Sequence, residues 1–317
     1  MKYLKIIVRI LLITVVPFLF IHGIRRADLD FNPDSKNAYL ATIADKMHLL
    51  HSVPSPRLIL MSGSSMAFGV DSDLLTKELE IPVINASLHF MLGSRFMMDQ
   101  LKSSVRKGDI VLITLEYLVT SKGICEEKLE ASDFYPPAKD WIHFTSFSEE
   151  IGAHAVHSLT DFKLLIGEAW SGTRRKPIDI KDTTSVFFRK CFTKNGDIIG
   201  HLNNPQPKFE VPEISFDVEF SKQIQDLNDF EDFAKQKGAT VFFTFPSYIE
   251  SGYEKNMPVI KKIEQQFRDK LNFTILGSPE YSVMDDKLFF DNVYHPNAQG
   301  RKIFSSRIIE LLEQERI

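Results

Sequence analysis

Two short segments, far apart in the sequence, carry the residue types that activate a hydroxyl nucleophile. Residues 58–66 form an apolar run that ends in a small-residue turn with serines at 62, 64 and 65. Residues 291–297 place Asp291 and His295 just ahead of a predicted C-terminal helix. A hydroxyl, a histidine that takes its proton and an acid that orients the histidine make up an activated serine. The two segments together therefore indicate acyl-transfer chemistry.

The intervening chain alternates short apolar runs with helical patterns, which predicts the scaffold for these segments. Strands are predicted at residues 57–61, 81–84, 109–115, 239–245 and 273–276. Helices are predicted at residues 71–79, 94–105, 221–237, 257–271 and 297–313. Strands that are apolar on both faces and alternate with helices are typical of a parallel sheet covered on both sides. We therefore expect a three-layer α/β/α fold around a five-stranded parallel sheet.

Polar residues follow several of these strands, where ligands of an open parallel sheet bind. Residues 62–65 follow the first strand, residues 85–87 the second, and Glu116 and Tyr117 the third. The Asp291–His295 loop follows the last strand. We expect these segments to meet at one edge of the sheet.

At this point the chain resembles the SGNH, or GDSL-type, hydrolase superfamily, whose fold is flavodoxin-like. Gly63, Ser64, Ser65 and Met66 are similar to its Gly-Asp-Ser-Leu block, which implies that Ser65 is the nucleophile. Its amide, at a strand-to-helix turn, is then expected to face an oxyanion. Residues 83–87 resemble the second block, with Ser87 in place of the glycine that supplies an oxyanion amide. The last block of the family supplies the acid and the base, and its likeness to residues 291–295 implies that His295 is the general base.

Two positions depart from the family pattern. The third block, Gly-x-Asn-Asp, is replaced by a segment with Glu116 and Tyr117, and a carboxylate there opposes an oxyanion unless it is turned away or protonated. Tyr117 is an alternative donor. The family spaces its dyad as Asp-x-x-His, which falls on Asn292, whereas Asp291 lies four residues before His295. We favour Asp291 as the orienting acid because only a carboxylate stabilises an imidazolium by charge.

These departures resemble one branch of the superfamily, the anchored envelope proteins of alginate acetylation and teichoic acid D-alanylation. The resemblance implies an extracytoplasmic serine esterase or O-acyltransferase acting on acyl groups of a cell-envelope glycan or polymer. It also implies a membrane-bound O-acyltransferase as a partner, and no cofactor. The loss of the third-block asparagine leaves an alternative, a catalytically silent scaffold that binds a glycan or such a partner.

The N-terminus reads as a membrane anchor over residues 1–24. Residues 6–24 include Arg9 as the only charged side chain, and this length is close to the span of a bilayer. We favour an anchor over a cleaved signal peptide because no small-x-small cleavage pattern follows the run. The flanking basic residues predict a cytoplasmic N-terminus and an extracytoplasmic body. Residues 25–56 are expected to form a stalk or packing helix, and residues 57–317 the α/β domain.

Residues 119–216 interrupt the alternation and are expected to form an inserted cap, with a helical pattern at residues 162–170. Cys125 and Cys191 lie in this region, and an oxidising compartment favours a disulfide between them, with two separate thiols as the alternative. His154 and His157 have helical metal-ligand spacing, but no third ligand accompanies them, so we expect no metal. The net charge of −4 gives no reason to expect nucleic acid.

Overall fold

The computed structural model describes residues 2–31, 35–171 and 186–317, and its centre is a parallel sheet of five strands in the order β2-β1-β3-β4-β6. The strands of this sheet are β1 (Leu58–Met61), β2 (Val83–Asn85), β3 (Ile110–Ile113), β4 (Thr240–Thr244) and β6 (Ile275–Leu276). All five lie within the predicted runs to within two residues. The predicted α/β class and five-stranded parallel sheet are confirmed.

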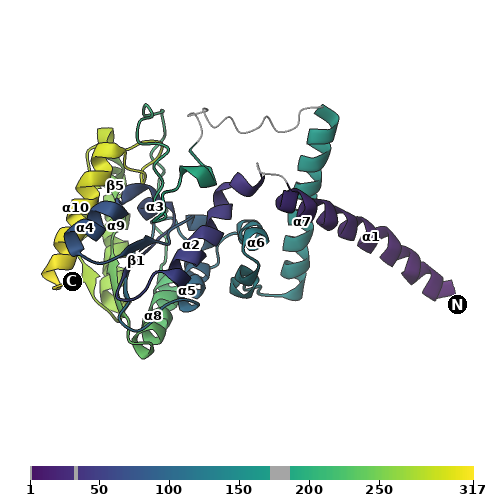
Figure 1. The fold of residues 1–317 in the computed structure, drawn as a ribbon, viewed down its shortest axis with the longest axis horizontal. Coiled ribbons are helices and arrows are strands. Elements are labelled where there is room, and N and C mark those ends of the chain that lie inside the picture. The colour runs from purple at the N-terminus through teal and green to yellow at the C-terminus, as the bar shows by residue number, and fades with distance from the viewer. Residues whose placement is uncertain (1, 32–34, 172–185) are drawn as a thin grey trace.

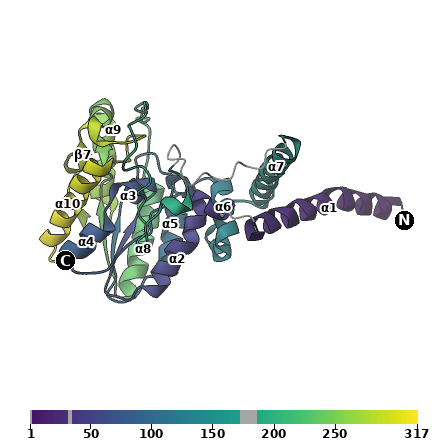
Figure 2. The ribbon, with the colours of Figure 1, turned by 45° about the horizontal axis from the view of Figure 1, so that its top comes forward.

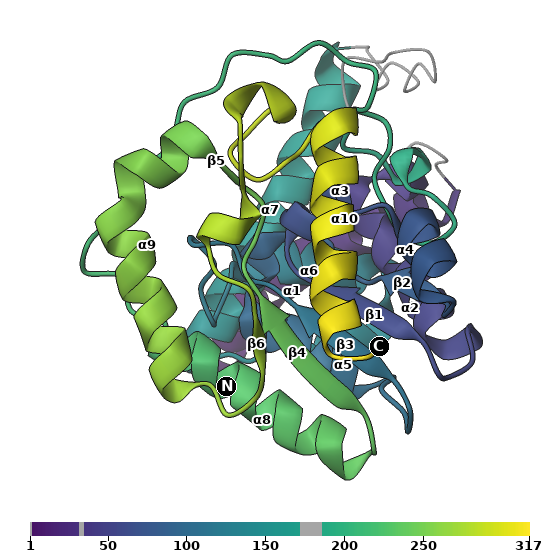
Figure 3. The same ribbon diagram turned by 90° about the vertical axis from the view of Figure 1, so that its left-hand side faces the viewer.

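Helices cover both faces of this sheet, as Figure 3 shows: α4 packs with α10 on one face, and α5 packs with α8 on the other. The α-helices are α1 (Lys2–Phe31), α2 (Thr42–Ser52), α3 (Ser64–Gly69), α4 (Ser72–Leu79), α5 (Ser94–Lys102), α6 (Cys125–Phe134), α7 (Phe147–Ser171), α8 (Ser221–Gln236), α9 (Glu250–Lys270) and α10 (Ala298–Gln314). The short 3-10 helices are η1 (Ser35–Asn37), η2 (Tyr39–Ala41), η3 (Phe90–Leu92), η4 (Pro136–Trp141), η5 (Arg189–Cys191), η6 (Glu280–Ser282) and η7 (Asp286–Leu288).

The sequence patterns missed two features near the C-terminal half. A second, two-stranded parallel sheet pairs β5 (Tyr248–Ile249) with β7 (Val283–Met284), and strands this short leave no periodic pattern. Helix α9 begins at Glu250 rather than near Met257. A proline such as Pro258 is typical of the first turn of a helix, where its missing N–H needs no partner, and this favours the later start. In the structure, Pro258 lies inside α9.

The N-terminal helix α1 extends away from the rest of the molecule (Figure 1), and residues Tyr3–Ala27 are long and apolar enough to cross a membrane. It continues to Phe31, beyond the predicted anchor boundary at residue 24. The expected stalk helix is shorter than predicted, because η1 and η2 precede α2.

Residues 119–216 lie outside the main sheet and form α6, η4, α7, η5 and loops, while residues 172–185 of this segment lie outside the described part. Helix α7 is much longer than the pattern at residues 162–170 predicts. The predicted disulfide is wrong, because Cys125 and Cys191 are both free. Cys125 packs with Leu129 and Ala153 between α6 and α7, and Cys191 is in η5.

A fully buried ion pair fixes the amino end of the sheet. Two nitrogens of Arg57, just before β1, meet the two carboxylate oxygens of Asp109, just before β3, at 3.1 and 3.0 Å. Both side chains have no exposed surface. Asp109 also accepts a hydrogen bond from the backbone N–H of Arg106.

We expect Asp109→Asn to lower the free energy of unfolding by roughly 3–5 kcal/mol, because it leaves the Arg57 cation buried without a counter-ion. Urea unfolding followed by circular dichroism measures the change. The matched control is Glu78→Gln in the exposed pair with Lys77, for which we expect at most about 0.5 kcal/mol. Equal losses in the two variants would contradict this account of the buried pair.

Candidate active site

The carboxyl edge of the main sheet brings together the segments that the sequence assigns to it. Glu116, after β3, accepts hydrogen bonds from the turn that follows β1. Asn85, at the end of β2, donates its side-chain amide to the carbonyl of Met66 in α3. His295, in the loop before α10, contacts Ser64. The predicted convergence is confirmed.

His295 joins a serine and an acid in one hydrogen-bonded chain. Its Nδ1 lies 2.7 Å from Oδ1 of Asp291, and its Nε2 lies 2.8 Å from Oγ of Ser64. When Nδ1 donates its proton to the carboxylate, Nε2 is the unprotonated nitrogen that accepts the serine hydroxyl proton. The serine and histidine are 6% and 3% exposed, so this chain is largely shielded from water. This arrangement fits general-base activation of a hydroxyl.

The serine that shares a hydrogen bond with His295 is Ser64, and this corrects the prediction that Ser65 is the nucleophile. The hydroxyl of Ser65 instead donates to Oγ of Ser62 at 3.2 Å. Both serines are in α3, where successive side chains point about 100° apart, so only one of them faces the histidine. Phe68, four residues after Ser64 and on the same helix face, stacks on the His295 ring at 3.8 Å with an interplanar angle of 2°.

Glu116 is turned onto the backbone of the serine turn. Its carboxylate accepts the N–H of Ser65 at 2.8 Å and the N–H of Gly63 at 3.2 Å. A Cβ at position 63 would lie 2.5 Å from this carboxylate and 2.6 Å from Cα of Phe90, so only glycine fits there. The Ser65 amide is therefore occupied, and its predicted role as an oxyanion donor is wrong.

Asn292 also lies against His295. Its Nδ2 is 2.8 Å from Nδ1 and 3.3 Å from Nε2, while its Oδ1 accepts the N–H of Tyr294. One amide nitrogen close to both ring nitrogens lies beside or over the ring and is not in line with either lone pair. Asp291 is therefore the better partner of Nδ1, and the Asn292 amide remains a polar group at the site.

Ser87 and Tyr117 do not point polar atoms at the serine–histidine pair. The Ser87 amide donates to Oδ1 of Asn85 at 3.2 Å, so this N–H is already occupied. The Tyr117 ring packs against Tyr248 and Tyr294, and its hydroxyl is buried with no hydrogen-bond partner among the described residues. Burial raises the pKa of Tyr117 well above its ordinary value, so it stays protonated.

The N-terminal segment contributes an aromatic residue close to the site. Tyr39 in η2 donates its hydroxyl to the carbonyl of Leu88 at 2.6 Å, and its ring meets His89 edge-on. Burial raises the pKa of Tyr39, and the negative charges of Glu116 and Asp291 raise it further. Sequence reasoning treated this part of the chain only as a stalk.

A buried polar network ties the loop after η5 to the sheet and to α10. Asp197 accepts hydrogen bonds from Ser72 at 2.6 Å, from Asn85 at 2.8 Å and from Arg301 at 3.0 Å. Burial raises the pKa of Asp197, and the charge of Arg301 opposes this shift. Nearby, Lys46 donates to the carbonyls of Asn85 and Gly196, and burial lowers its pKa to about 7. Asn85 is therefore a structural residue.

The same loop supplies His201, which sequence reasoning missed. Its Nε2 donates to the carbonyl of Pro296, the residue after His295, at 2.9 Å, and its ring packs against Phe68. The side chain is fully buried, and burial lowers its pKa to about 4. His201 is therefore neutral at pH 7, and it holds the loop before α10 through one hydrogen bond.

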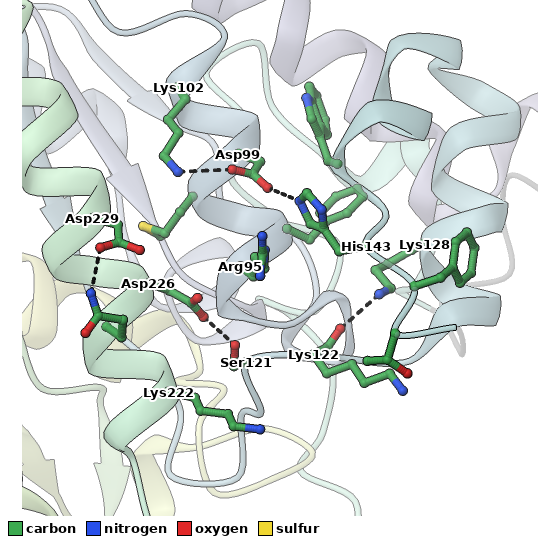
Figure 4. A pocket seen from close by; sticks show the side chains of 16 residues that line it. Arg95, Asp99, Lys102, Ser121, Lys122, Lys128, His143, Lys222, Asp226 and Asp229 are labelled. Carbon is green, nitrogen blue, oxygen red and sulfur yellow. Dashed lines mark hydrogen bonds and ion pairs between the residues drawn. The ribbon is translucent and has the colours of Figure 1, made fainter. Parts of the chain in front are cut away.

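One large cavity in the described structure lies away from these residues. It measures about 560 Å³ and lies beside α5, α8 and the loop after η4 (Figure 4). Some of its charged groups pair with one another: Asp99 meets Lys102 and His143. Asp226 accepts the hydroxyl of Ser121. Neither the serine nor the histidine lines this cavity, so the hydrogen-bonded chain and not the cavity defines the candidate site.

No group of three or more metal-ligating side chains occurs among the residues that the structure describes. His157 contacts Asp133 at 3.1 Å, and His154 packs near the ring of Phe144. The two histidines therefore have separate structural partners.

Comparison with known proteins adds no relative to this geometry, since no family model matches the chain and no curated protein matches it.

We expect Glu116→Gln to lower the free energy of unfolding by roughly 1–3 kcal/mol, because an amide cannot accept both turn N–H groups and loses the charge-assisted bonds. Urea unfolding measures the change. Glu313→Gln, at an exposed position of α10, is the control and is expected to leave stability within about 0.5 kcal/mol. A Glu116→Gln protein as stable as its parent would show that the carboxylate does not hold the turn.

The lowered pKa of His201 predicts how the stability of the fold changes at acid pH. A histidine with a lowered folded-state pKa binds its proton more weakly when folded, so stability falls as pH drops from about 6.5 towards 4. Between pH 7 and pH 5 this loss is about 2 kcal/mol. We expect His201→Gln to remove most of that dependence, measured as the urea midpoint at both pH values. If the variant kept the pH dependence of its parent, this assignment to His201 would be refuted.

Proposed function

We propose that this protein is a membrane-anchored serine esterase or O-acyltransferase that acts on acyl groups of a cell-envelope glycan or polymer. The observation that carries the proposal is the chain from Ser64 through His295 to Asp291, with distances of 2.8 and 2.7 Å. The resemblance to SGNH hydrolases supports the same chemistry, with the nucleophile moved by one residue. The apolar helix α1 supports attachment to a membrane, and its basic flank favours an extracytoplasmic body.

In this mechanism, Ser64 Oγ attacks the carbonyl carbon of the acyl ester while His295 Nε2 takes the hydroxyl proton. Asp291 stabilises the imidazolium through Nδ1–H. Collapse of the tetrahedral intermediate breaks the ester bond, and His295 returns the proton to the leaving alcohol. The acyl group then rests on Ser64. Water or a glycan hydroxyl, activated by the same histidine, completes hydrolysis or transfer.

The oxyanion of this mechanism needs hydrogen-bond donors other than the amides of Gly63 and Ser65, which Glu116 already occupies. The side-chain amide of Asn292, beside His295, is the donor we propose for this role.

Glu116 occupies the amides of Gly63 and Ser65, and this favours a second candidate function. A protein that keeps the fold but has lost its oxyanion donors acts as a scaffold for a glycan or for a membrane-bound O-acyltransferase. The two candidates differ in whether Ser64 reacts covalently.

Labelling with a serine-reactive fluorophosphonate separates them. We expect the parent and Ser65→Ala to label, and Ser64→Ala not to label, because only Ser64 shares a hydrogen bond with the base. Turnover of a small acyl ester or an acylated glycan should fall at least about a thousandfold in Ser64→Ala and in His295→Ala, since the two residues act as a unit.

The Ser65→Ala variant is the matched control, because it removes a neighbouring hydroxyl from the same helix. Labelling that survives Ser64→Ala would refute the assigned nucleophile. A parent protein that neither labels nor turns over any acyl substrate would support the scaffold.

A further inference from the structure

Helix α7 exposes a row of apolar side chains along one face. Phe147, Ile151 and Leu159 are 75%, 53% and 55% exposed, and Ala155 is exposed between them. These four residues recur every four positions and form one face of the helix, which we call the α7 stripe. No described residue covers it. A contiguous apolar face of this kind marks a surface for a membrane or a partner.

The opposite face of α7 packs against the protein through small and polar side chains. Ala153 is buried against Cys125 and Leu129 of α6, and His157 meets Asp133 at 3.1 Å. Because Ala153 lies on the other side of the helix from Ile151, the α7 stripe points away from α6. Helix α7 therefore packs on α6 through one face while the α7 stripe on the other face stays exposed.

The position of α7 relative to α1 indicates what covers the stripe. Helix α7 contacts α1 and runs across it, between α6 and the free N-terminal part of α1, in both Figure 1 and Figure 2. The side of α7 that faces away from α6 is therefore the side towards which α1 extends. If α1 crosses a bilayer, this side faces the bilayer.

The position of α7 along α1 also fits a location at the membrane surface. Arg25, close to the end of the apolar span Tyr3–Ala27, lies 3.9 Å from Asp133, the same carboxylate that contacts His157 of α7. Arginines at the end of a membrane span lie at the headgroups. Asp133 thus fixes α7 at the level where α1 leaves the hydrocarbon.

We propose that α7 is an in-plane membrane helix, whose stripe inserts into the interfacial layer of the leaflet from which the body emerges. Lipid covers the α7 stripe. Helices with an apolar face and a polar face bind this layer by burying the apolar side chains at the acyl boundary. Together, α1 and α7 form a two-point attachment that fixes the tilt of the body. The inference depends on α1 as the span and is independent of the chemistry at Ser64.

Nitroxide accessibility in lipid nanodiscs that contain only this full-length chain tests the proposal. In a background of Cys125→Ala and Cys191→Ser, one variant carries the label at Ile151→Cys. The matched control carries it at Thr160→Cys, an exposed position on the other side of the same helix. Circular dichroism checks that both labelled proteins are folded.

We expect the label at 151 to collide with oxygen and to be shielded from a water-soluble nickel complex, relative to the label at 160. Equal access of the nickel complex at both positions would overturn the proposal. Shielding at 151 that appears only after a membrane-embedded partner protein is added would also overturn it, since the occupant would then be that protein. Loss of catalytic activity leaves this readout unchanged, so its failure is distinct from failure of the proposed enzyme.

Discussion

The geometry of the site depends on one buried carboxylate. Glu116, at the end of β3, holds the turn after β1 through the N–H groups of Gly63 and Ser65. Those two bonds set the start of α3, and the start of α3 decides which serine faces His295. The close approach needs the missing side chain of Gly63. A neutral side-chain amide in this position would present one acceptor oxygen instead of two, so it would not satisfy two N–H donors in the same way.

A second layer of contacts ties His295 to regions outside the sheet. The loop after η5 reaches the site through His201 and reaches α10 through Asp197 and its ion pair with Arg301. Phe68 covers one face of the His295 ring. This stacking and the bond from His201 to Pro296 restrict the imidazole to the orientation that joins Asp291 and Ser64. Orientation of the base is a requirement of general-base catalysis, because the proton must move along the hydrogen bond.

The sequence was sufficient for the features that periodicity and capping control. The apolar runs locate all five strands of the main sheet, and Asn297, the first residue of the predicted helix at residues 297–313, caps α10 with its side chain. The choice between Ser64 and Ser65 lies beyond pattern reasoning, because it depends on where α3 begins, and Glu116 sets that point from another strand. One local signal existed: Phe68 follows Ser64 by four residues, a spacing that brings an aromatic ring and a hydroxyl to the same side. His201 gave no signal, since its contact with Pro296 joins residues 95 positions apart. The cysteines are free because they lie in separate packing clusters, Cys125 between α6 and α7 and Cys191 against the cluster around Phe68, and composition does not reveal this separation.

Helix α6 links the site to the apolar helix α1 and to α7. Near its first turn, Glu127 lies 3.5 Å from His89, which contacts Tyr39 beside the site. Near its end, Asp133 meets Arg25 of α1 and His157 of α7. Glu127 and Asp133 are six helical residues apart, which is about 9 Å along the helix axis, so α6 is a short rigid link between the edge of the sheet and the end of the apolar helix. In the proposed function, this link sets the distance between Ser64 and the surface at which an acyl group is delivered.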